Sequence, residues 1–597
     1  MATNSRYGSD DLALGAIAIL VVGFLLLAAG GLLAALLSGH GLPTQHVSGS
    51  LTAFAHVEHP SAAWRVPVGP AWLYWTVTST VVVLGAIAGV FIARLVRRDA
   101  REQSADPTRI AGLAQRHEVV AAAGARHLVA RGAILRPSVV QPQPSDLGLF
   151  VGTSRRVACY ASVEDSMVIL GPPRSGKGYH LVIPFILDAP GAVVTTSTRP
   201  DNLAATMTAR QKLGPVGVFD PQGLALGVSG GLRWSPIRGC ENPQTAMMRA
   251  GALCAGAAGG VKDANFWQQQ TEVVVRCLLQ AAAVTDRSVV DLYRWSLSPD
   301  EAKEAVEILK TSPRATPQWG SALGSIVGLE ERPRANIWSV VSSVFAPLAS
   351  PKVIEQLSPP PDAQFHPAAF LREHGTLYLL GTSSGAFATA NFVSALIEDV
   401  VETARVIASA SSGARLDPPL ALILDEAANY PLPSLGALMS EGGGTGVTTV
   451  AVLQSLAQAR SRWGHEPAQA IWDSATSKVI LGGSSNAGDL RDIAQLMGER
   501  DAPEFSTTRQ AGGGRNVSES TRRRPVLDPS MIRLLRVGHA LLMLRAAPPI
   551  MLTLTPWTAR RDARRLRDER RGVEASLREG ARSHAPYGDS TLRGLDE

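Results

Sequence analysis

The chain has 597 residues, of which 45% are hydrophobic and only 18% charged, against about 25% charged in an ordinary soluble protein. This composition excludes an intrinsically disordered chain, leaves room for roughly two to four domains, and indicates that part of the chain lies in lipid. Arginine carries most of the positive charge behind the net +6, and the four cysteines lack the CxxC spacing of a zinc ribbon or disulfide scaffold.

Two apolar stretches near the N-terminus have the length of membrane-spanning helices. Residues 12–37 and 71–92 carry no charge, and about 20 such residues cross a bilayer. A cleaved signal peptide fits less well, because its apolar region runs only about 7–15 residues after a basic start. Arginines follow the second stretch at once, which places the N-terminus and the bulk of the chain in the cytoplasm. We therefore expect residues 1–98 to form a membrane anchor with two spans.

Residues 99–150 are predicted to be a linker and partly helical stalk. Two short apolar strands follow, at 157–160 and 167–170. A phosphate-binding loop is predicted directly after the second strand. The pattern is GxxxxGK, followed by an apolar helix at 179–187. Its glycines let backbone N–H groups face a phosphate, and Lys177 would reach the β- and γ-phosphates. The predicted nucleotide-binding residues are Gly171, Pro172, Pro173, Arg174, Ser175, Gly176, Lys177 and Gly178.

This loop departs from the strict pattern at its last position. Gly178 stands where Ser or Thr normally ligates magnesium, and Ser175 lies on the wrong side of Lys177 to replace it simply. Mg²⁺ would then depend more on phosphates, water and a distant carboxylate.

An acid pair supplies that carboxylate. Residues 420–424 form an apolar run of the buried parallel-strand type, which ends in Asp425 and Glu426. Open α/β sheets bind ligands at this end of their strands. We expect Asp425 to hold Mg²⁺, directly or through water, and Glu426 to orient or deprotonate the attacking water. The alternative is that Asp425 merely caps a helix.

Gln454 follows another predicted strand, 448–453, where its amide could sense the γ-phosphate; a plain loop-facing role is nearly as well supported.

The phosphate loop at Lys177 and the acid pair at Asp425 lie farther apart in sequence than a bare nucleotide-binding core requires, so a further segment is inserted between them. Residues 242–357 have helical periodicity, for example at 266–283 and 289–309, and are predicted to be an inserted all-helical subdomain. Further core strands are predicted at 192–196, 216–219, 376–380, 478–482, 540–544 and 550–554.

Three later segments carry weaker signals. The glycine cluster 442–444 is predicted to be a loop, and 504–524, rich in Ser, Thr, Gly and Arg, to be a mobile loop. Residues 558–571 are rich in arginine and interspersed with acids. They could bind a nucleic acid backbone, but a solvated mixed-charge helix followed by a frayed tail is the better-supported interpretation.

The ordered combination of these motifs resembles one family. The features that match are the two N-terminal spans, residues 171–178, Phe219-Asp220-Pro221, Asn265-Phe266-Trp267, Leu424-Asp425-Glu426, Val452-Leu453-Gln454-Ser455 and residues 541–549. Over most of residues 1–557 the chain resembles type IV secretion coupling proteins, the TraG/TraD class of conjugation ATPases.

The resemblance implies an α/β fold: a RecA-like P-loop NTPase domain (151–241 and 358–557) with the inserted all-helical subdomain, preceded by two transmembrane helices and followed by a charged tail, 558–597. It implies a homo-hexamer in the inner or plasma membrane that uses ATP and Mg²⁺. Its partners would be DNA, presented by a relaxase complex, or protein effectors, and the components of a type IV secretion channel.

One family feature is missing, because the segment 441–446 lacks the arginine that often reaches a neighbouring subunit's nucleotide. Either Arg460 or Arg462 serves instead, or hydrolysis is slower. Two alternatives to a DNA-translocating coupling ATPase stay open. The missing arginine and Gly178 leave room for an adaptor that recruits protein substrates and scarcely hydrolyses ATP. The other is an FtsK-like translocase of double-stranded DNA, which is disfavoured because no winged-helix DNA reader follows the predicted motor.

Overall fold

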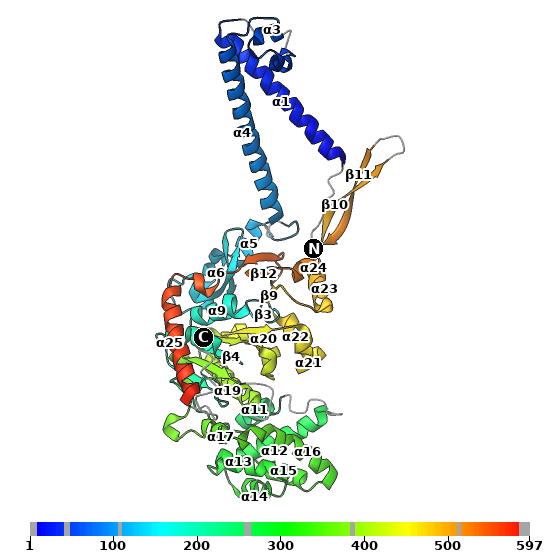
Figure 1. Ribbon diagram of the computed structural model, residues 1–597. Helices are drawn as coiled ribbons and strands as arrows, with labels where there is room; N and C mark the ends of the chain where they lie inside the picture. Colours follow the sequence, from blue (N-terminus) through cyan, green and yellow to red (C-terminus); the bar gives the residue numbers. More distant parts are fainter. Residues whose placement is uncertain are drawn as a thin grey trace. The chain divides into compact units, whose positions relative to one another are not determined.

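The computed structural model describes residues 9–40, 48–105, 110–255, 264–381, 389–509 and 515–583, and the chain divides into two compact units, Met1–Arg109 and Ile110–Glu597 (Figure 1). Within these ranges, the side chains of residues 9–20, 92–105, 264–265, 502–509 and 515–519 lie outside the description.

The first unit is an antiparallel pair of long helices, α1 (Ser9–Leu37) and α4 (Ala71–Ala105), joined through α2 (Gly49–Thr52), η2 (Ala53–Ala55) and α3 (Pro60–Trp64) (Figure 1). A Cβ on Gly30 would lie 2.7 Å from the Thr78 Cα, and one on Gly85 would lie 2.6 Å from Leu26. The small residues therefore let the two helices approach closely. At the connecting end, the Trp64 indole is fully buried and donates a hydrogen bond to the Tyr74 hydroxyl at 3.1 Å.

One described helix is long and apolar enough to cross a membrane, the part of α4 from Ala71 to Phe91. The described apolar part of α1, Val21–Leu37, is shorter, and the rest of the predicted span 12–37 lies outside the described side chains. A multi-pass anchor is therefore not supported by these residues alone.

An eleven-stranded sheet forms the centre of the second unit, with the strand order β2-β1-β13-β12-β9-β3-β8-β7-β4-β6-β5. From β9 to β5 all neighbours are parallel, whereas β12, β13, β1 and β2 add an antiparallel edge. The strands are β1 (Gly148–Ser154), β2 (Val157–Ser162), β3 (Met167–Leu170), β4 (Val193–Ser197), β5 (Val216–Phe219), β6 (Thr376–Leu380), β7 (Leu420–Leu424), β8 (Val447–Leu453), β9 (Ser477–Leu481), β12 (His539–Leu544) and β13 (Ile550–Thr553). The structure thus confirms a mixed α/β fold with a large parallel sheet.

Both faces of this sheet are buried. Along β3, Val168 and Leu170 belong to one hydrophobic cluster while Met167 and Ile169 belong to another on the opposite face. Alternate side chains of a strand point to opposite faces, so a strand buried on both sides must be apolar throughout. The helices that follow strands are α9 (Ile183–Asp188), α10 (Asp201–Arg210), α19 (Ala390–Ser409), α20 (Leu435–Thr445), α21 (Leu456–Trp463), α22 (His465–Ser474), α23 (Ala487–Leu496) and α24 (Pro529–Arg533). The short helix α18 (Pro367–Arg372) directly precedes β6.

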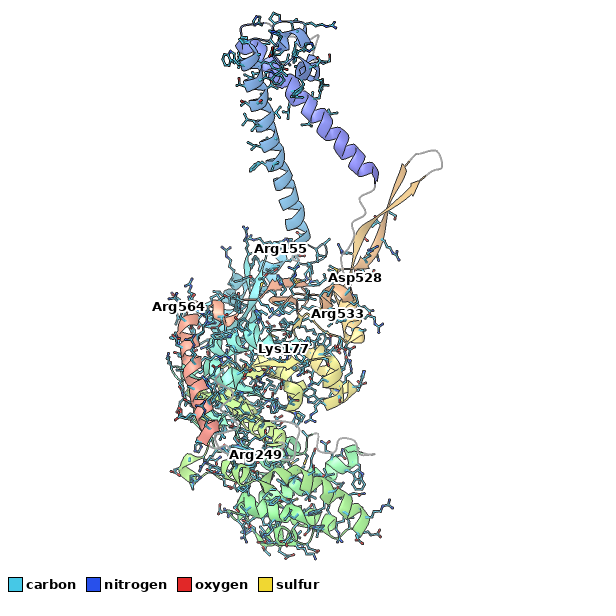
Figure 2. All side chains as sticks on the ribbon, in the orientation of Figure 1. Arg155, Lys177, Arg249, Asp528, Arg533 and Arg564 are labelled. Atoms are coloured by element: carbon cyan, nitrogen blue, oxygen red, sulfur yellow. The ribbon has the colours of Figure 1, made fainter. Side chains whose placement is uncertain are left out.

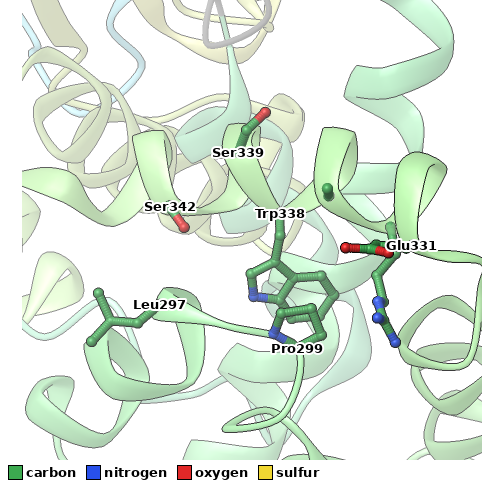
Figure 3. A pocket seen from close by; sticks show the side chains of 8 residues that line it. Leu297, Pro299, Glu331, Trp338, Ser339 and Ser342 are labelled. Atoms are coloured by element: carbon green, nitrogen blue, oxygen red, sulfur yellow. The ribbon is translucent and has the colours of Figure 1, made fainter.

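The segment between β5 and β6 contains a group of helices. They are α11 (Pro243–Cys254), α12 (Ala264–Val284), α13 (Val289–Leu297), α14 (Lys303–Thr311), α15 (Trp319–Val327), α16 (Glu331–Phe345), η5 (Ala346–Ala349) and α17 (Pro351–Leu357). The periodic segment 289–309 is divided between two helices, because Pro299 follows the end of α13 and a new helix starts at Lys303. A pocket in this group, with Trp338 beside Pro299, is lined mainly by uncharged side chains (Figure 3).

One segment agrees with its predicted helical content, and two segments differ from the sequence predictions. Residues 116–147 form the short helices α5 (Arg116–Ala123), α6 (Ala125–Ala130), α7 (Gly132–Leu135) and α8 (Pro144–Leu147), with fully buried side chains such as Val119 and Leu135. Residues 504–509 and 515–524 of the predicted mobile loop lie in an antiparallel strand pair, β10 (Glu499–Arg509) and β11 (Arg515–Pro525), while 510–514 lie outside the described residues. The predicted glycine loop 442–444 is the end of α20, where a Cβ on Gly443 would lie 2.0 Å from the Glu164 carbonyl oxygen.

The final described helix, α25 (Ala563–Ser583), follows η9 (Trp557–Ala559) and packs against the sheet unit. Leu566 is buried in a cluster with Ile183, Ala205 and Trp557. Charged pairs join the same elements, Lys212 with Glu569 and Arg560 with Asp188. The arginine-rich segment is therefore only partly solvated, since one face of its helix is packed.

Candidate nucleotide site

The segment after β3 turns sharply before a helix begins. The Gly171 N–H donates to the Leu453 carbonyl of β8 at 3.0 Å, and the Ser175 N–H donates to the Pro172 carbonyl at 3.3 Å. Arg174 and Gly176 have positive φ angles of 64° and 88°. At Gly176 a side chain would also collide with the ring of His180, because its Cβ would lie 2.7 Å from Nδ1. The predicted phosphate loop is thus a tight turn that opens directly into a helix, first η4 (Gly178–Val182) and then α9.

The Lys177 side chain folds back across this turn (labelled in Figure 2). Its ammonium group donates to the Gly171 carbonyl at 2.6 Å and to the Pro172 carbonyl at 3.1 Å. Burial lowers the pKa of Lys177, while the nearby charges of Asp425 and Glu426 act in the opposite direction. The lysine and both predicted acids therefore belong to one electrostatic site.

Asp425 lies at the carboxyl end of β7 and is held through two of its oxygens. The Asn202 amide donates to Asp425 Oδ2 at 3.1 Å, and the Thr196 hydroxyl donates to the Asp425 main-chain carbonyl at 2.8 Å. Burial raises the pKa of Asp425, the Glu426 charge adds to this effect, and the Asn202 hydrogen bond and Lys177 charge oppose it. A partly buried acid in this position gains from a bound cation.

Glu426 is turned away from the strand by an αL backbone conformation, with φ 54° and ψ 45°. Its Oε2 accepts a hydrogen bond from the Thr198 hydroxyl at 2.7 Å and one from the Asn429 amide at 3.0 Å. The two adjacent carboxylates thus have separate hydrogen-bond partners. Such separation suits two separate chemical tasks.

Strand order brings the predicted residues together. The strand β8 lies between β3 and β7, so Gln454, which follows it directly, lies between the phosphate loop and the acid pair. Because neighbouring strands are about 4.8 Å apart, β3 and β7 are separated by roughly 10 Å, within the reach of a bound triphosphate. The backbone N–H of Gln454 interacts with the Gln458 side chain at 3.4 Å.

Three polar side chains near the acids were missed by the sequence analysis: Thr198, Asn202 and Asn429. The first two follow β4, which is the parallel neighbour of β7. Ligands of open α/β sheets bind at the carboxyl ends of the strands, and this holds for β4 as well as for β7. The polar run Thr198-Arg199-Pro200-Asp201-Asn202 directly after β4 could therefore have identified these residues from the sequence.

The residues of this site fit a magnesium nucleotide. Within the described ranges there is no group of three or more His, Cys, Asp or Glu side chains that could hold a metal ion by themselves. Mg²⁺ is usually held by one or two carboxylates together with phosphate oxygens and water, which matches a site with Asp425 beside a phosphate loop. The buried Ser175 hydroxyl has no hydrogen-bond partner in the structure, so the loop has an unused polar group.

The two arginines considered as substitutes for the missing family arginine differ in their surroundings. Arg460 donates to the buried Asp489 carboxylate at 2.7 Å, and the same carboxylate accepts the Leu456 N–H at 3.1 Å. Arg462 is partly buried, which lowers its pKa. The segment 441–446 belongs mostly to α20.

Residues 419–536 match a family model described as the TraM recognition site of TraD and TraG. The predicted resemblance to the TraG/TraD class is confirmed. The TraG/TraD match includes Asp425, Glu426 and Gln454, while the phosphate loop lies outside it. No curated protein matches this chain.

Several solved structures are similar to this chain at low sequence identity. The unbound bacterial conjugative coupling protein TrwBdeltaN70 is 18% identical, with a TM-score of 0.48, over 72% of this chain and 91% of that chain. TrwB in complex with ADP and Mg²⁺ is 17% identical, with a TM-score of 0.49, over 71% and 91%. VirB4 of Thermoanaerobacter pseudethanolicus is 13% identical, with a TM-score of 0.39, over 68% and 96%. At these TM-scores the likenesses carry no conclusion about function.

Proposed function

We propose that this chain is a membrane-anchored, ATP-driven coupling protein that delivers a relaxase–DNA complex or protein substrates to a type IV secretion channel. The observation that carries the proposal is the convergence of Lys177 with Asp425 and Glu426 at the carboxyl edge of one parallel sheet. The match to the TraM recognition site of TraD and TraG supports the coupling class.

Each residue of the site has a task in this proposal. The backbone of residues 171–178 cradles the phosphates, and Lys177 leaves the loop carbonyls to bind the β- and γ-phosphates. Asp425 holds Mg²⁺, which supplies charge neutralisation on the phosphates when it is bound. Glu426, fixed by Thr198 and Asn429, orients the attacking water. Gln454 senses the γ-phosphate from its place between the two motifs.

The domain assignment follows from the same proposal. Residues 151–241 and 358–557 form a RecA-like motor, 242–357 an all-helical domain that reads the cargo, and 99–150 a connecting segment. Residues 1–98 anchor the chain through two spans. The antiparallel packing of α1 on α4 supports this membrane hairpin, and 558–597 are the C-terminal extension. Six copies would form a ring, with Arg462 of one copy available to the nucleotide of the next.

The first experiment measures ATP hydrolysis by the full chain in detergent micelles. Lys177→Ala should reduce hydrolysis by on the order of 10²-fold or more, because it removes the ammonium group proposed to bind the β- and γ-phosphates. Lys478→Ala is the matched control. Lys478 is also a partly buried lysine that donates to a main-chain carbonyl, that of Ala475, but it lies at the amino end of β9. Equal hydrolysis by both variants would remove the nucleotide site from the proposal.

A second candidate function is a recruitment adaptor with little ATPase activity. The absence of an arginine in 441–446 and of a hydroxyl at Gly178 favours it. Addition of single- or double-stranded DNA separates the two functions. A motor is stimulated by DNA, and the stimulation weakens steeply as salt is raised because the contacts are to phosphates. Nucleotide binding without DNA-stimulated hydrolysis would leave the adaptor as the function.

A further inference from the structure

Asn202 bridges the two halves of the nucleotide site. It is the second residue of α10, its side chain is 3% exposed, and its amide nitrogen donates to Asp425 Oδ2 at 3.1 Å. Its amide oxygen faces the other way, 3.7 Å from the position that a Cβ would take on Gly178. No other heavy atom of the described residues, apart from chain neighbours and the helix backbone, lies within 4 Å of that position.

The position of Asn202 is fixed by its own helix. Its main-chain carbonyl accepts a hydrogen bond from the Thr206 hydroxyl at 2.7 Å, and that hydroxyl is 2.6 Å from the Tyr378 hydroxyl of β6. The first turn of α10 is thereby tied to the sheet. A side chain in this setting keeps a defined direction, which a liganding or positioning role requires.

The orientation of the amide follows from the acid that it binds. An ionised carboxylate only accepts hydrogen bonds, so the Asn202 nitrogen must face Asp425 and the oxygen must face Gly178. The space beside Gly178 is where a Ser or Thr side chain of the strict phosphate-loop pattern would begin. An amide carbonyl and a hydroxyl are both neutral oxygen ligands of hard cations.

We infer that Asn202 supplies the oxygen that Gly178 lacks, so that Mg²⁺ of a bound nucleotide is held, directly or through one water, by Asn202 together with Asp425. The loss of a hydroxyl from the loop is compensated by an amide from the neighbouring strand–helix connection. This inference rests on the proposed nucleotide-binding function and assigns one further residue to that site.

The test is a Mg²⁺ titration of the binding of a fluorescent ADP analogue to the full chain in detergent, compared with binding in EDTA. Asn202→Ala should raise the Mg²⁺ concentration needed for half-maximal effect by about 10–100-fold, the range found when supporting ligands of a metal are removed. Its binding in EDTA should be unchanged. In the same background, Gly178→Ser should recover most of the lost Mg²⁺ affinity by returning an oxygen to the loop.

Two further variants separate a metal role from a structural one. Asn202→Asp removes the donor to Asp425 but keeps an oxygen toward Gly178, so it should keep the wild-type Mg²⁺ requirement or lower it. Asn429→Ala removes the equivalent amide from Glu426 and should leave the Mg²⁺ midpoint unchanged. Thermal unfolding without nucleotide checks that each variant folds; if Asn202→Ala does not, the isosteric Asn202→Asp decides.

The experiment distinguishes failure of the Mg²⁺ role of Asn202 from failure of the proposed nucleotide-binding function. A wild-type Mg²⁺ midpoint in folded Asn202→Ala, or an Asn202→Asp variant that loses Mg²⁺ affinity, overturns the role of Asn202. If the wild-type chain binds no nucleotide, or binds it no better than Lys177→Ala does, the proposed function itself fails.

Discussion

Asp425 and Glu426 are neighbours in sequence but face different surroundings. Asp425 ends an apolar strand and accepts a hydrogen bond from Asn202, whereas the αL backbone at Glu426 turns its carboxylate toward Thr198 and Asn429. A left-handed conformation at a non-glycine residue costs of order 1–3 kcal/mol and persists only where surrounding structure enforces it. The strain places two carboxylates at one strand end without giving them the same partner.

The protonation of Asp425 gives the first prediction. Because burial raises its pKa, the folded chain prefers the neutral carboxyl, and ionisation lowers the free energy of unfolding as the pH rises through that pKa. Asp425→Asn removes this penalty, so the variant should melt at a higher temperature than the wild type at pH 8 in EDTA. The difference should shrink as the pH falls, because the raised pKa lets the wild-type carboxyl take up its proton.

The same variant should lose the Mg²⁺ dependence of nucleotide binding, because an amide supplies no charge to the cation. Thermal unfolding across this pH range and Mg²⁺ titration of nucleotide binding are the two measurements. A melting temperature below that of the wild type at every pH would contradict the assignment of a destabilising charge to Asp425.

The second prediction concerns the orientation of Glu426. Thr198→Val removes the hydroxyl that donates to Oε2 at 2.7 Å, so kcat should fall by about 10–100-fold with the nucleotide Kd unchanged. Thr195→Val is the matched control, since the buried Thr195 hydroxyl of β4 has no partner in the structure. Replacing it by a side chain of the same shape should change neither quantity. Equal kcat values for the two variants would deny a role to Thr198.

The sequence identified part of this site. Lys177, Asp425 and Glu426 stand in local patterns whose chemistry is readable, namely a glycine-rich loop and an acid pair after an apolar strand. Asn202 and Thr198 belong to no such pattern. Their role depends on β4 being the parallel neighbour of β7, and strand order is a tertiary property that no local spacing encodes.

Helix α25 connects the C-terminal segment to the elements of the site. Leu566 is 1% exposed and packs with Ile183 of α9 and Ala205 of α10, the helices that follow the phosphate loop and β4. Leu566→Ala should therefore lower the free energy of unfolding by about 2–5 kcal/mol, because it leaves a cavity in a packed cluster.

A matched control lies on the same helix. Arg564 is exposed (Figure 2), and Arg564→Ala should stay within about 0.5 kcal/mol of the wild type. Thermal and urea unfolding of the full chain compares the two variants. Equal stability of the two would mean that α25 is not packed on the sheet unit in solution.

A buried charge holds the helical group to the sheet unit. Arg249 of α11 donates to Asp399 of α19 at 2.8 Å and lies 5.4 Å from the ring centroid of Trp234, whose indole donates to the same carboxylate at 3.0 Å. Arg249→Ala leaves Asp399 without its cation. It should cost about 3–5 kcal/mol in the free energy of unfolding.

The control for this fourth prediction is an exposed pair. Arg233 and Glu355 lie 2.6 Å apart at the surface, and Arg233→Ala should cost less than about 1 kcal/mol. Differential scanning calorimetry of the full chain reports whether the transition that includes the helical group moves. Similar shifts for both variants would show that the buried pair adds nothing beyond a surface contact.

Elements with a clear hydrophobic pattern could be predicted from the sequence, and elements without one could not. Buried parallel strands such as β3, β5, β6 and β7 are short apolar runs and were located to the residue. The strand pair β10–β11 was missed because its polar sequence shows no apolar period. The helical state of the glycine cluster in α20 was missed, and the close approach of Glu164 to one of these glycines, Gly443, is a tertiary contact that the sequence does not reveal.

At the scale of the whole chain, charge and hydropathy predict that an N-terminal membrane unit is separate from the rest, and the structure also divides the chain into two compact units. The first unit ends at Arg109, soon after the run of arginines that follows residues 71–92. If this unit is a membrane hairpin, its connecting segment lies outside the cell membrane and the sheet unit lies in the cytoplasm. All four native cysteines are buried in the second unit, so the chain gives a low background for thiol labelling.

The fifth prediction uses this low background. His56→Cys places a thiol in the exposed connection between η2 and α3, and Lys303→Cys places one at the start of α14 on the surface of the helical group. In spheroplasts, a membrane-impermeant maleimide should label the first variant at once and the second only after permeabilisation. Labelling of both before permeabilisation, or of neither, would contradict a membrane crossing by α4 between residues 56 and 303, which the two-span anchor requires.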